Sequence, residues 1–238
     1  MDSVSLYAFE AASTPNIEDL ASSIEPAHSF GTFTSASFYA MMSHCGAIPQ
    51  PLDREFRPYA IGDITNRWIP LRMKGAGYNT FLITSNPLLY NKGQMDYKFD
   101  HYHYDMEEGI RTPAMIQWFS EHYVEPFFVV MLCMETHYPF MNRDKRRSTQ
   151  IKAIEFLDTQ VKTIYNLLPE DSRLIITSDH GEIFNGIEHW GHKPFDTRIR
   201  NANRLHELLD VFLAIIEKPK DSTLRDISRP QTNFDLFG

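Results

Sequence analysis

Residues 174–182, LIITSDHGE, join a short apolar run to a polar turn, and this junction decides the fold. Residues 174–177 are apolar and rich in β-branched side chains, which is typical of a buried strand. In open α/β sheets, ligands bind just beyond the carboxyl ends of strands, where Asp179 and His180 stand here. These two side chains can offer a carboxylate oxygen and an imidazole nitrogen to one metal ion. Taken alone, however, an Asp-His pair is more common as a plain surface turn, so the rest of the sequence must decide.

Two further histidines follow apolar segments in a similar way. His137 stands in Glu-Thr-His-Tyr-Pro-Phe, directly after the apolar run of residues 127–134. His192 stands in Gly-His-Lys, twelve residues after His180, with His189 as a competitor for its role. Histidine supplies metal ligands and proton carriers near neutral pH. Three histidines at strand ends or in adjacent loops are hard to explain as packing, and together they indicate a functional site.

Strand and helix patterns alternate along the chain, which predicts an α/β fold with a mostly parallel sheet covered by helices. Apolar runs predict buried strands, and apolar residues at helical spacing predict helices. The strands are expected at residues 81–84, 127–134 and 174–177, and the helices at 14–24, 35–43 and 149–168.

Three features leave alternatives or predict no function. Residues 211–216 fit either a strand or the end of a helix. Residues 101–105, HYHYD, carry two alternating histidines, and an exposed strand is a better explanation than a metal site. Asp158, on the helix of residues 149–168, is expected to be solvated.

Composition bounds the class of protein. The 238 residues fit one α/β domain, 1–238, and 42% hydrophobic residues suffice to bury its core. The net charge of −8 argues against a nucleic-acid-binding protein. No apolar run reaches the roughly 18–20 residues of a membrane helix, and no secretory signal is expected at the start. Two cysteines, Cys45 and Cys133, cannot form a disulfide framework, so we expect a reducing, cytoplasmic setting.

A run of small and hydroxyl residues, GTFTSAS at 31–37, precedes the helix predicted at 35–43. A hydroxyl group at a helix N-terminus lies beside free backbone N–H groups and in the field of the helix dipole. That position favours an alkoxide and binds phosphate or sulfate oxygens. A plain helix cap, a role that Ser and Thr often fill, explains the same residues on local sequence alone.

The order of these motifs resembles the sulfatase branch of the alkaline phosphatase superfamily. The resemblance runs from Asp2 to about Pro219 and rests on the combination, because no single motif is specific. It consists of Asp2, TPNIEDLA at 14–21, a hydroxyl before a helix that ends in Gly-x-x-Pro, KGAGYNT at 74–80, THYPF at 136–140, SDHGE at 178–182 and GHK at 191–193. It implies a three-layer α/β/α sandwich that hydrolyses or transfers phosphate and sulfate esters.

The resemblance also implies roles for individual residues. Thr34 matches a nucleophile that forms a phosphothreonine intermediate, with Thr32 and Ser35 as rivals. The matching metal ligands are Asp2, Thr34, Asp179 and His180. Histidines that contact the phosphoryl group, or protonate the leaving group, correspond to His137 and His192, with Lys193 as an additional anion contact.

Departures from the family pattern move the expectation from sulfate towards phosphate. Formylglycine sulfatases need Cys/Ser-x-Pro-x-Arg, whereas residues 34–38 read TSASF and Cys45 lies elsewhere. The imidazole of His180 favours zinc or manganese over calcium or magnesium. We therefore expect a metal-dependent hydrolase or transferase of small phosphate esters. A sulfuric-ester hydrolase without formylglycine and a non-catalytic metal-binding homologue are the alternatives, and the oligomeric state stays open.

One feature weakens the predicted metal site. Family members carry a strand immediately before the metal-binding Asp, whereas Asp2 is the second residue here. The sheet is therefore expected to have a missing or truncated first strand, unless the true start lies upstream or another strand fills the gap. Without a first strand, Asp2 would stand on a frayed terminus.

Overall fold

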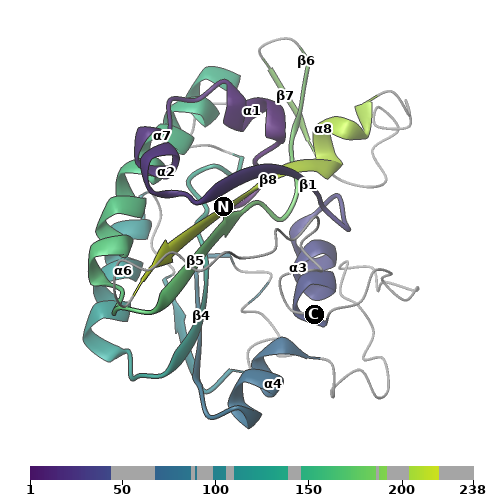
Figure 1. Cartoon of the computed structure of the whole chain (residues 1–238). Coiled ribbons are helices and arrows are strands. Elements are labelled where there is room, and N and C mark those ends of the chain that lie inside the picture. The colour runs from purple at the N-terminus through teal and green to yellow at the C-terminus, as the bar shows by residue number, and fades with distance from the viewer. Residues whose placement is uncertain are drawn as a thin grey trace.

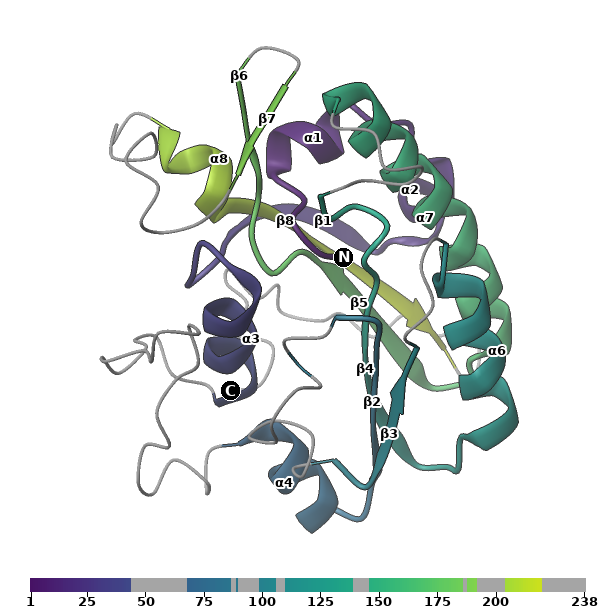
Figure 2. The same ribbon diagram turned by 180° about the vertical axis from the view of Figure 1, so that it is seen from behind.

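A computed structural model describes residues 1–43, 68–86, 89, 99–105, 110–138, 146–185, 188–191 and 204–219. Its central layer consists of two three-stranded sheets that lie edge to edge, with β4 beside β5 (Figures 1 and 2). The first sheet has the order β3-β2-β4 and is parallel throughout. Its strands are β2 (Asn79–Thr84), β3 (His101–Tyr104) and β4 (Phe127–Leu132).

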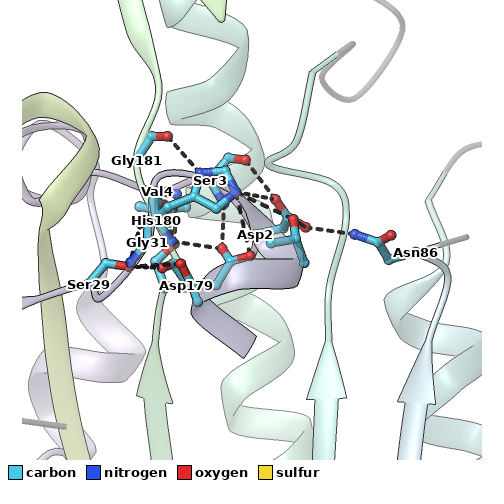
Figure 3. A network of polar contacts seen from close by, with 12 residues as sticks. Asp2, Ser3, Val4, Ser29, Gly31, Asn86, Asp179, His180 and Gly181 are labelled. Atoms are coloured by element: carbon cyan, nitrogen blue, oxygen red, sulfur yellow. Dashed lines mark hydrogen bonds and ion pairs between the residues drawn. The ribbon is translucent and has the colours of Figure 1, made fainter. Parts of the chain in front are cut away.

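The second sheet is antiparallel, because its middle strand runs against the other two. The other five described strands of the layer share one direction, which confirms the expectation of a mostly parallel layer (Figure 3). The order of the second sheet is β1-β8-β5, from β1 (Ser23–His28), β8 (Asp210–Lys218) and β5 (Ser172–Thr177), and β8 runs against both neighbours. For the next strand to pair parallel to β5, the chain would need a crossover connection, usually a helix that runs back along the sheet. After β5 the described chain instead forms the hairpin of β6 (Ile183–Asn185) and β7 (Glu188–Gly191) and the short α8 (His206–Leu209). These elements lie near the carboxyl end of β5, so β8 runs back from there (Figure 1).

Helices cover both faces of the central layer, which confirms the three-layer α/β/α architecture (Figures 1 and 2). One face carries α1 (Leu6–Glu10), α2 (Pro15–Leu20), α6 (Thr112–His122) and α7 (Arg147–Leu167), and the other carries α3 (Thr34–Ser43) and α4 (Ile69–Gly75). Alternate side chains of β2 show why both faces are covered. Phe81 and Ile83 pack with α6 and α7, whereas Leu82 packs with α3 and α4.

Most of the predicted elements are present within a few residues of their expected bounds. The ambiguous residues 211–216 lie in strand β8, and residues 101–104 form edge strand β3 within the described chain. The segment 14–24 is only partly helical, since α2 ends at Leu20 and β1 begins at Ser23.

Asp158 is not solvated, contrary to expectation, because only 1% of it is exposed. Its Oδ1 accepts a hydrogen bond from the Ile17 amide at 2.8 Å, and its Oδ2 accepts one from the Asn16 amide at 3.1 Å. A carboxylate there satisfies free N–H groups at the start of α2. Asp158 on α7 therefore fixes the position of α2.

The start of the chain is ordered, and the expectation of a frayed Asp2 is wrong. The Met1 amino nitrogen donates to the Thr177 carbonyl at 2.9 Å, at the end of β5. The Asp2 amide donates to the Cys133 carbonyl at 3.0 Å, just beyond β4. Thr136 Oγ1 in turn donates to the Asp2 carbonyl at 2.6 Å. Residues 1 and 2 therefore lie between the two sheets and bridge them, and Asp2 is 0% exposed.

Among the residues that the structure describes, none of the helices combines the length and the apolar character needed to cross a membrane.

Candidate metal and phosphoryl site

Three buried side chains converge where β4 and β5 end, namely Asp2, Asp179 and His180 (Figure 3). Each can offer one ligand atom, and these atoms all lie within 4.8 Å of one another. His180 Nε2 lies 3.8 Å from Asp2 Oδ1 and 3.6 Å from Asp179 Oδ2. The N-terminal segment and the turn after β5 therefore supply one compact set of oxygen and nitrogen donors.

The turn after β5 is held by its own polar groups. Ser178 Oγ accepts a hydrogen bond from the Val4 amide at 2.8 Å and donates one to the His180 carbonyl, also at 2.8 Å. Ser29 Oγ donates to the Asp179 carbonyl. These bonds satisfy buried backbone groups and fix the direction in which Asp179 and His180 leave the strand.

Gly181 is needed where the chain leaves the site. A Cβ atom at this position would lie 2.0 Å from the backbone oxygen of Glu207, which no side chain can tolerate. The Gly181 amide donates to the Leu208 carbonyl at 2.8 Å, which keeps the two segments in contact. The glycine therefore permits a close backbone approach directly beside His180.

The imidazole of His180 presents Nε2 to the cluster. Its Nδ1 lies 2.8 Å from the Gly181 carbonyl, and a carbonyl oxygen only accepts, so Nδ1 carries the hydrogen. In the neutral ring, Nε2 then carries the lone pair, the arrangement typical of metal-ligating histidines. Burial lowers the pKa of His180, against the opposing effect of the Asp2 and Glu182 charges, which favours this neutral form.

The two carboxylates suit a cation. Burial raises the pKa of Asp179 to about 7, and the nearby charge of Asp2 adds to the shift. Asp179 Oδ2 is buried and has no hydrogen-bond partner among the described residues. A buried carboxylate oxygen without a donor is costly unless a cation satisfies it. The donor set of two carboxylates and one imidazole fits a divalent ion such as zinc.

Thr34 is the first residue of α3 and is buried against this cluster. Its Oγ1 donates to Asp2 Oδ2 at 3.2 Å and lies 3.4 Å from His180 Nε2. Of the three hydroxyl candidates, Thr34 makes these contacts and neither Thr32 nor Ser35 makes a described contact to the cluster. The structure thus brings together four of the predicted residues: Asp2, Thr34, Asp179 and His180.

The remaining predicted residues are only partly described. His137 follows β4, is half-buried and donates its amide to the Met134 carbonyl at 3.0 Å. After burial, an electrostatic interaction with His137 is the second cause that lowers the pKa of His180. His192 and Lys193 lie outside the described residues, as does the side chain of His189.

Two residues of the site were missed in the sequence. Asn86, two residues after β2, is buried and its Nδ2 donates to Asp2 Oδ2 at 3.2 Å (Figure 3). Its position beyond the carboxyl end of a parallel strand was an available signal. Ser3 touches both carboxylates, through its amide to Asp179 and its hydroxyl to Asp2. Nothing in the local sequence pattern indicates this double contact.

Comparison with known proteins agrees with the geometry. A family model described as Sulfatase matches residues 1–207. Among solved structures, a protein of the alkaline phosphatase superfamily from Vibrio parahaemolyticus is 16% identical, with a TM-score of 0.59 over 94% of this chain. The C-terminal periplasmic domain of EptC from Escherichia coli, solved in complex with Zn, is 16% identical, with a TM-score of 0.57 over 99% of this chain. No curated protein shows significant similarity.

These likenesses confirm the fold. The chain spans 58% of the Vibrio protein and 78% of the EptC domain. At such low identity the shared feature is the α/β architecture of the superfamily, and the chemistry has to be argued from the residues of this chain.

Proposed function

This chain belongs to the Sulfatase family, and from that premise we propose that it is a metal-dependent hydrolase or transferase of phosphate esters with Thr34 as nucleophile. One observation carries the proposal. Thr34 Oγ1 lies at the N-terminus of α3, 3.2 Å from Asp2 Oδ2 and 3.4 Å from His180 Nε2. A hydroxyl at a helix N-terminus and beside a metal-ligand set is suited to attack an anionic ester.

Asp2, Asp179 and His180 are the proposed residues that would hold a divalent cation, with Thr34 Oγ1 as a further ligand. When bound, the cation neutralises phosphoryl oxygens and lowers the pKa of the Thr34 hydroxyl. The imidazole ligand favours zinc or manganese over calcium or magnesium. Asp179 Oδ2 is buried without a hydrogen-bond partner in the described part of the chain, which supports a cation at this place.

Thr34 supplies the nucleophilic oxygen. Its proton passes to Asp2 Oδ2, the present hydrogen-bond acceptor, as the bond from Oγ1 to phosphorus forms. The bond from phosphorus to the leaving oxygen breaks in line, and His137 or His192 returns a proton to that oxygen. Water, or the hydroxyl of an acceptor alcohol, then attacks the phosphothreonine and gives its proton to that histidine. The bond from phosphorus to Oγ1 breaks, and the proton held by Asp2 returns to Thr34. Free N–H groups at the start of α3 stabilise the phosphoryl oxygens.

Phosphate is favoured over sulfate by the residues around the nucleophile. Residues 34–38, TSASF, contain neither the proline nor the arginine of a formylglycine motif. A plain threonine hydroxyl beside paired metal ligands matches phosphoryl transfer through a covalent intermediate. Lys193 is a further proposed contact for the anionic group, and the substrate is a small phosphate ester.

The test compares the wild-type protein with Thr34→Ala, Thr34→Ser and Ser35→Ala after loading with zinc or manganese. Substrates are an aryl phosphate, an aryl phosphodiester and an aryl sulfate. We expect Thr34→Ala to lose turnover on the order of 10³-fold or more, Thr34→Ser to keep part of it, and Ser35→Ala to stay near wild type. Acid quenching followed by mass spectrometry should find one phosphoryl group on Thr34.

Three results would contradict the proposal in different ways. Turnover that survives in Thr34→Ala excludes this nucleophile. Faster cleavage of the sulfate than of either phosphate supports the sulfuric-ester alternative. Tight metal binding without activity on all three esters supports a non-catalytic homologue.

A further inference from the structure

Ser3 has an unusual backbone conformation at the centre of the site. Its φ angle of 63° lies in the left-handed region, which non-glycine residues adopt at an energetic cost. The residue is also fully buried. Such a cost persists only where surrounding contacts determine the conformation, and outliers of this kind cluster at functional sites.

Surrounding contacts hold the backbone around Ser3 on both sides. Its carbonyl accepts a hydrogen bond from Gln150 Nε2 at 2.8 Å. The amide of the next residue, Val4, donates to Ser178 Oγ at 2.8 Å. On the other side, the Asp2 amide and carbonyl are bonded to Cys133 and Thr136. The left-handed turn is therefore fixed by the segment after β4, by α7 and by the turn after β5.

In this conformation one residue reaches both carboxylates of the metal-ligand set (Figure 3). The Ser3 amide donates to Asp179 Oδ1 at 3.0 Å, and Ser3 Oγ donates to Asp2 Oδ1 at 2.6 Å. Each carboxylate thus has one oxygen occupied by Ser3. The second oxygen of Asp179 has no hydrogen-bond partner among the described residues, and the second oxygen of Asp2 faces Thr34 and Asn86.

Two buried carboxylates this close repel one another, and free side chains would rotate apart. A donor on one oxygen of each removes that freedom and offsets part of the repulsion. The remaining oxygens are then held in place, Asp2 Oδ2 at 3.2 Å from Thr34 Oγ1 and Asp179 Oδ2 at 3.6 Å from His180 Nε2. Residues that hydrogen-bond to metal ligands generally orient them in this way, and losing such a residue costs about 10- to 100-fold in metal affinity.

We propose that Ser3 is a positioning residue that aligns Asp2 and Asp179 for one divalent cation. The inference rests on the proposed metal site and adds a residue to it that touches neither substrate nor metal. It assigns separate tasks to the two donors of Ser3. The hydroxyl orients Asp2, and the amide, set by the left-handed turn, orients Asp179.

The test measures zinc affinity by competition with a chromogenic chelator, together with the Tm in EDTA. The variants are Ser3→Ala, Ser3→Gly, Ser5→Ala and Asp179→Asn. Ser5 is the matched control, because its Oγ accepts from the Ala8 amide at 3.2 Å and caps α1, two residues away from Ser3. Asp179→Asn removes a proposed ligand and so identifies which part of the measured zinc binding occurs at this site.

We expect Ser3→Ala to bind zinc about 10- to 100-fold more weakly than wild type. Ser5→Ala should lower the Tm with unchanged zinc affinity. Ser3→Gly removes the hydroxyl but relieves the cost of the positive φ angle. It should therefore have a higher Tm than Ser3→Ala and still bind zinc weakly, a separation that a merely structural role would not produce.

Zinc affinity within twofold of wild type in both Ser3 variants overturns the role of Ser3 and leaves the proposed function intact. Equal losses of zinc affinity in the Ser3 and Ser5 variants would indicate that Ser3 acts only in folding, and they also overturn its positioning role. Wild-type protein that binds no zinc overturns the metal site itself, and the inference with it. If Ser3→Ala does not fold, Ser3→Gly alone decides between these outcomes.

Discussion

The amide of Ser3 and the carboxylate of Asp179 form a 3.0 Å hydrogen bond across 176 positions of sequence. The bond ties the start of the chain to the turn after β5. Asp2 makes a comparable connection to the segment after β4 through its own amide and carbonyl. The candidate site is therefore built where the two sheets meet, and its charges affect the stability of the fold.

Asp179→Asn should change the pH dependence of stability in the metal-free protein. Burial and Asp2 raise the pKa of Asp179 from 3.8 to about 7 in the folded state. Between these values the folded state holds a proton that the unfolded state has released. The contribution of this Asp179 proton to the free energy of unfolding is complete below pH 3.8 and is lost as the pH rises through about 7. Wild type should therefore lose stability over this range, whereas the variant lacks that loss.

The measurement is the Tm of both proteins in EDTA at several pH values from 4 to 8. The difference, variant minus wild type, should increase with pH. Other groups such as His180 titrate in both proteins and largely cancel in the difference. A difference that stays constant across the range would show that the Asp179 carboxyl is not perturbed as described.

Zinc should stabilise the wild-type protein, and chelation should reverse the effect. A ligand at 100 times its Kd adds about 2.7 kcal/mol to the free energy of unfolding. His180→Asn removes Nε2 while keeping a donor for the Gly181 carbonyl, so it should lose most of the zinc-induced rise in Tm. His28→Ala is the control, because His28 is an exposed residue paired with Asp210 at the surface. An equal rise in both variants would place the zinc elsewhere.

Gly181→Ala should disrupt the turn beside His180. The new Cβ would lie 2.0 Å from the Glu207 backbone oxygen, so the backbone of one segment has to move. We expect a loss of about 2–4 kcal/mol in the free energy of unfolding. Gly75→Ala is the matched control, because a Cβ there meets nothing within 4 Å and alanine favours the helix. Urea unfolding measures the free energy of unfolding of both variants. Equal losses in the two would contradict a close approach at Gly181.

Asp158→Ala should destabilise the contact between α2 and α7. The change removes three hydrogen bonds, from the Asn16 amide, Asn16 Nδ2 and the Ile17 amide. We expect a loss of about 1–3 kcal/mol in the free energy of unfolding, with zinc affinity unchanged. Glu155→Ala is a control on the same helix, since Glu155 accepts one exposed bond of 3.4 Å from the Ser13 amide within the described part of the chain. Similar losses in the two variants would argue against a capping role for Asp158.

The strands and the motifs at their ends were predictable from sequence because both depend on local pattern. Residues 172–177 form strand β5, in which Ile176 is buried, and Asp179 and His180 follow at its carboxyl end. These features need only apolar periodicity and the rule that ligands gather at strand ends. Local sequence showed a run of hydroxyl residues before a helix, whereas the choice of Thr34 over Thr32 and Ser35 came from the resemblance to the sulfatase branch.

Features that depend on distant partners were not predictable. The positive φ of Ser3 follows from contacts with the segment after β4, with α7 and with the turn after β5, none of which is local. Asp158 looked solvated because its partners on α2 lie more than 140 positions away in sequence. The antiparallel direction of β8 reflects the path of the chain after β5, and an apolar run has no preferred direction.

The bridge made by residues 1 and 2 links ligand occupancy to local opening of the molecule. Separating β4 from β5 near their carboxyl ends breaks the bonds from Met1 to Thr177 and from Asp2 to Cys133. The same motion withdraws the Asp2 carboxylate from its neighbours. A cation held by Asp2 would therefore oppose this opening, and amide hydrogen exchange at Asp2 would slow in proportion to its occupancy. The hydrogen-exchange rate of the Asp2 amide thus becomes a measure of the fractional occupancy of the cation site.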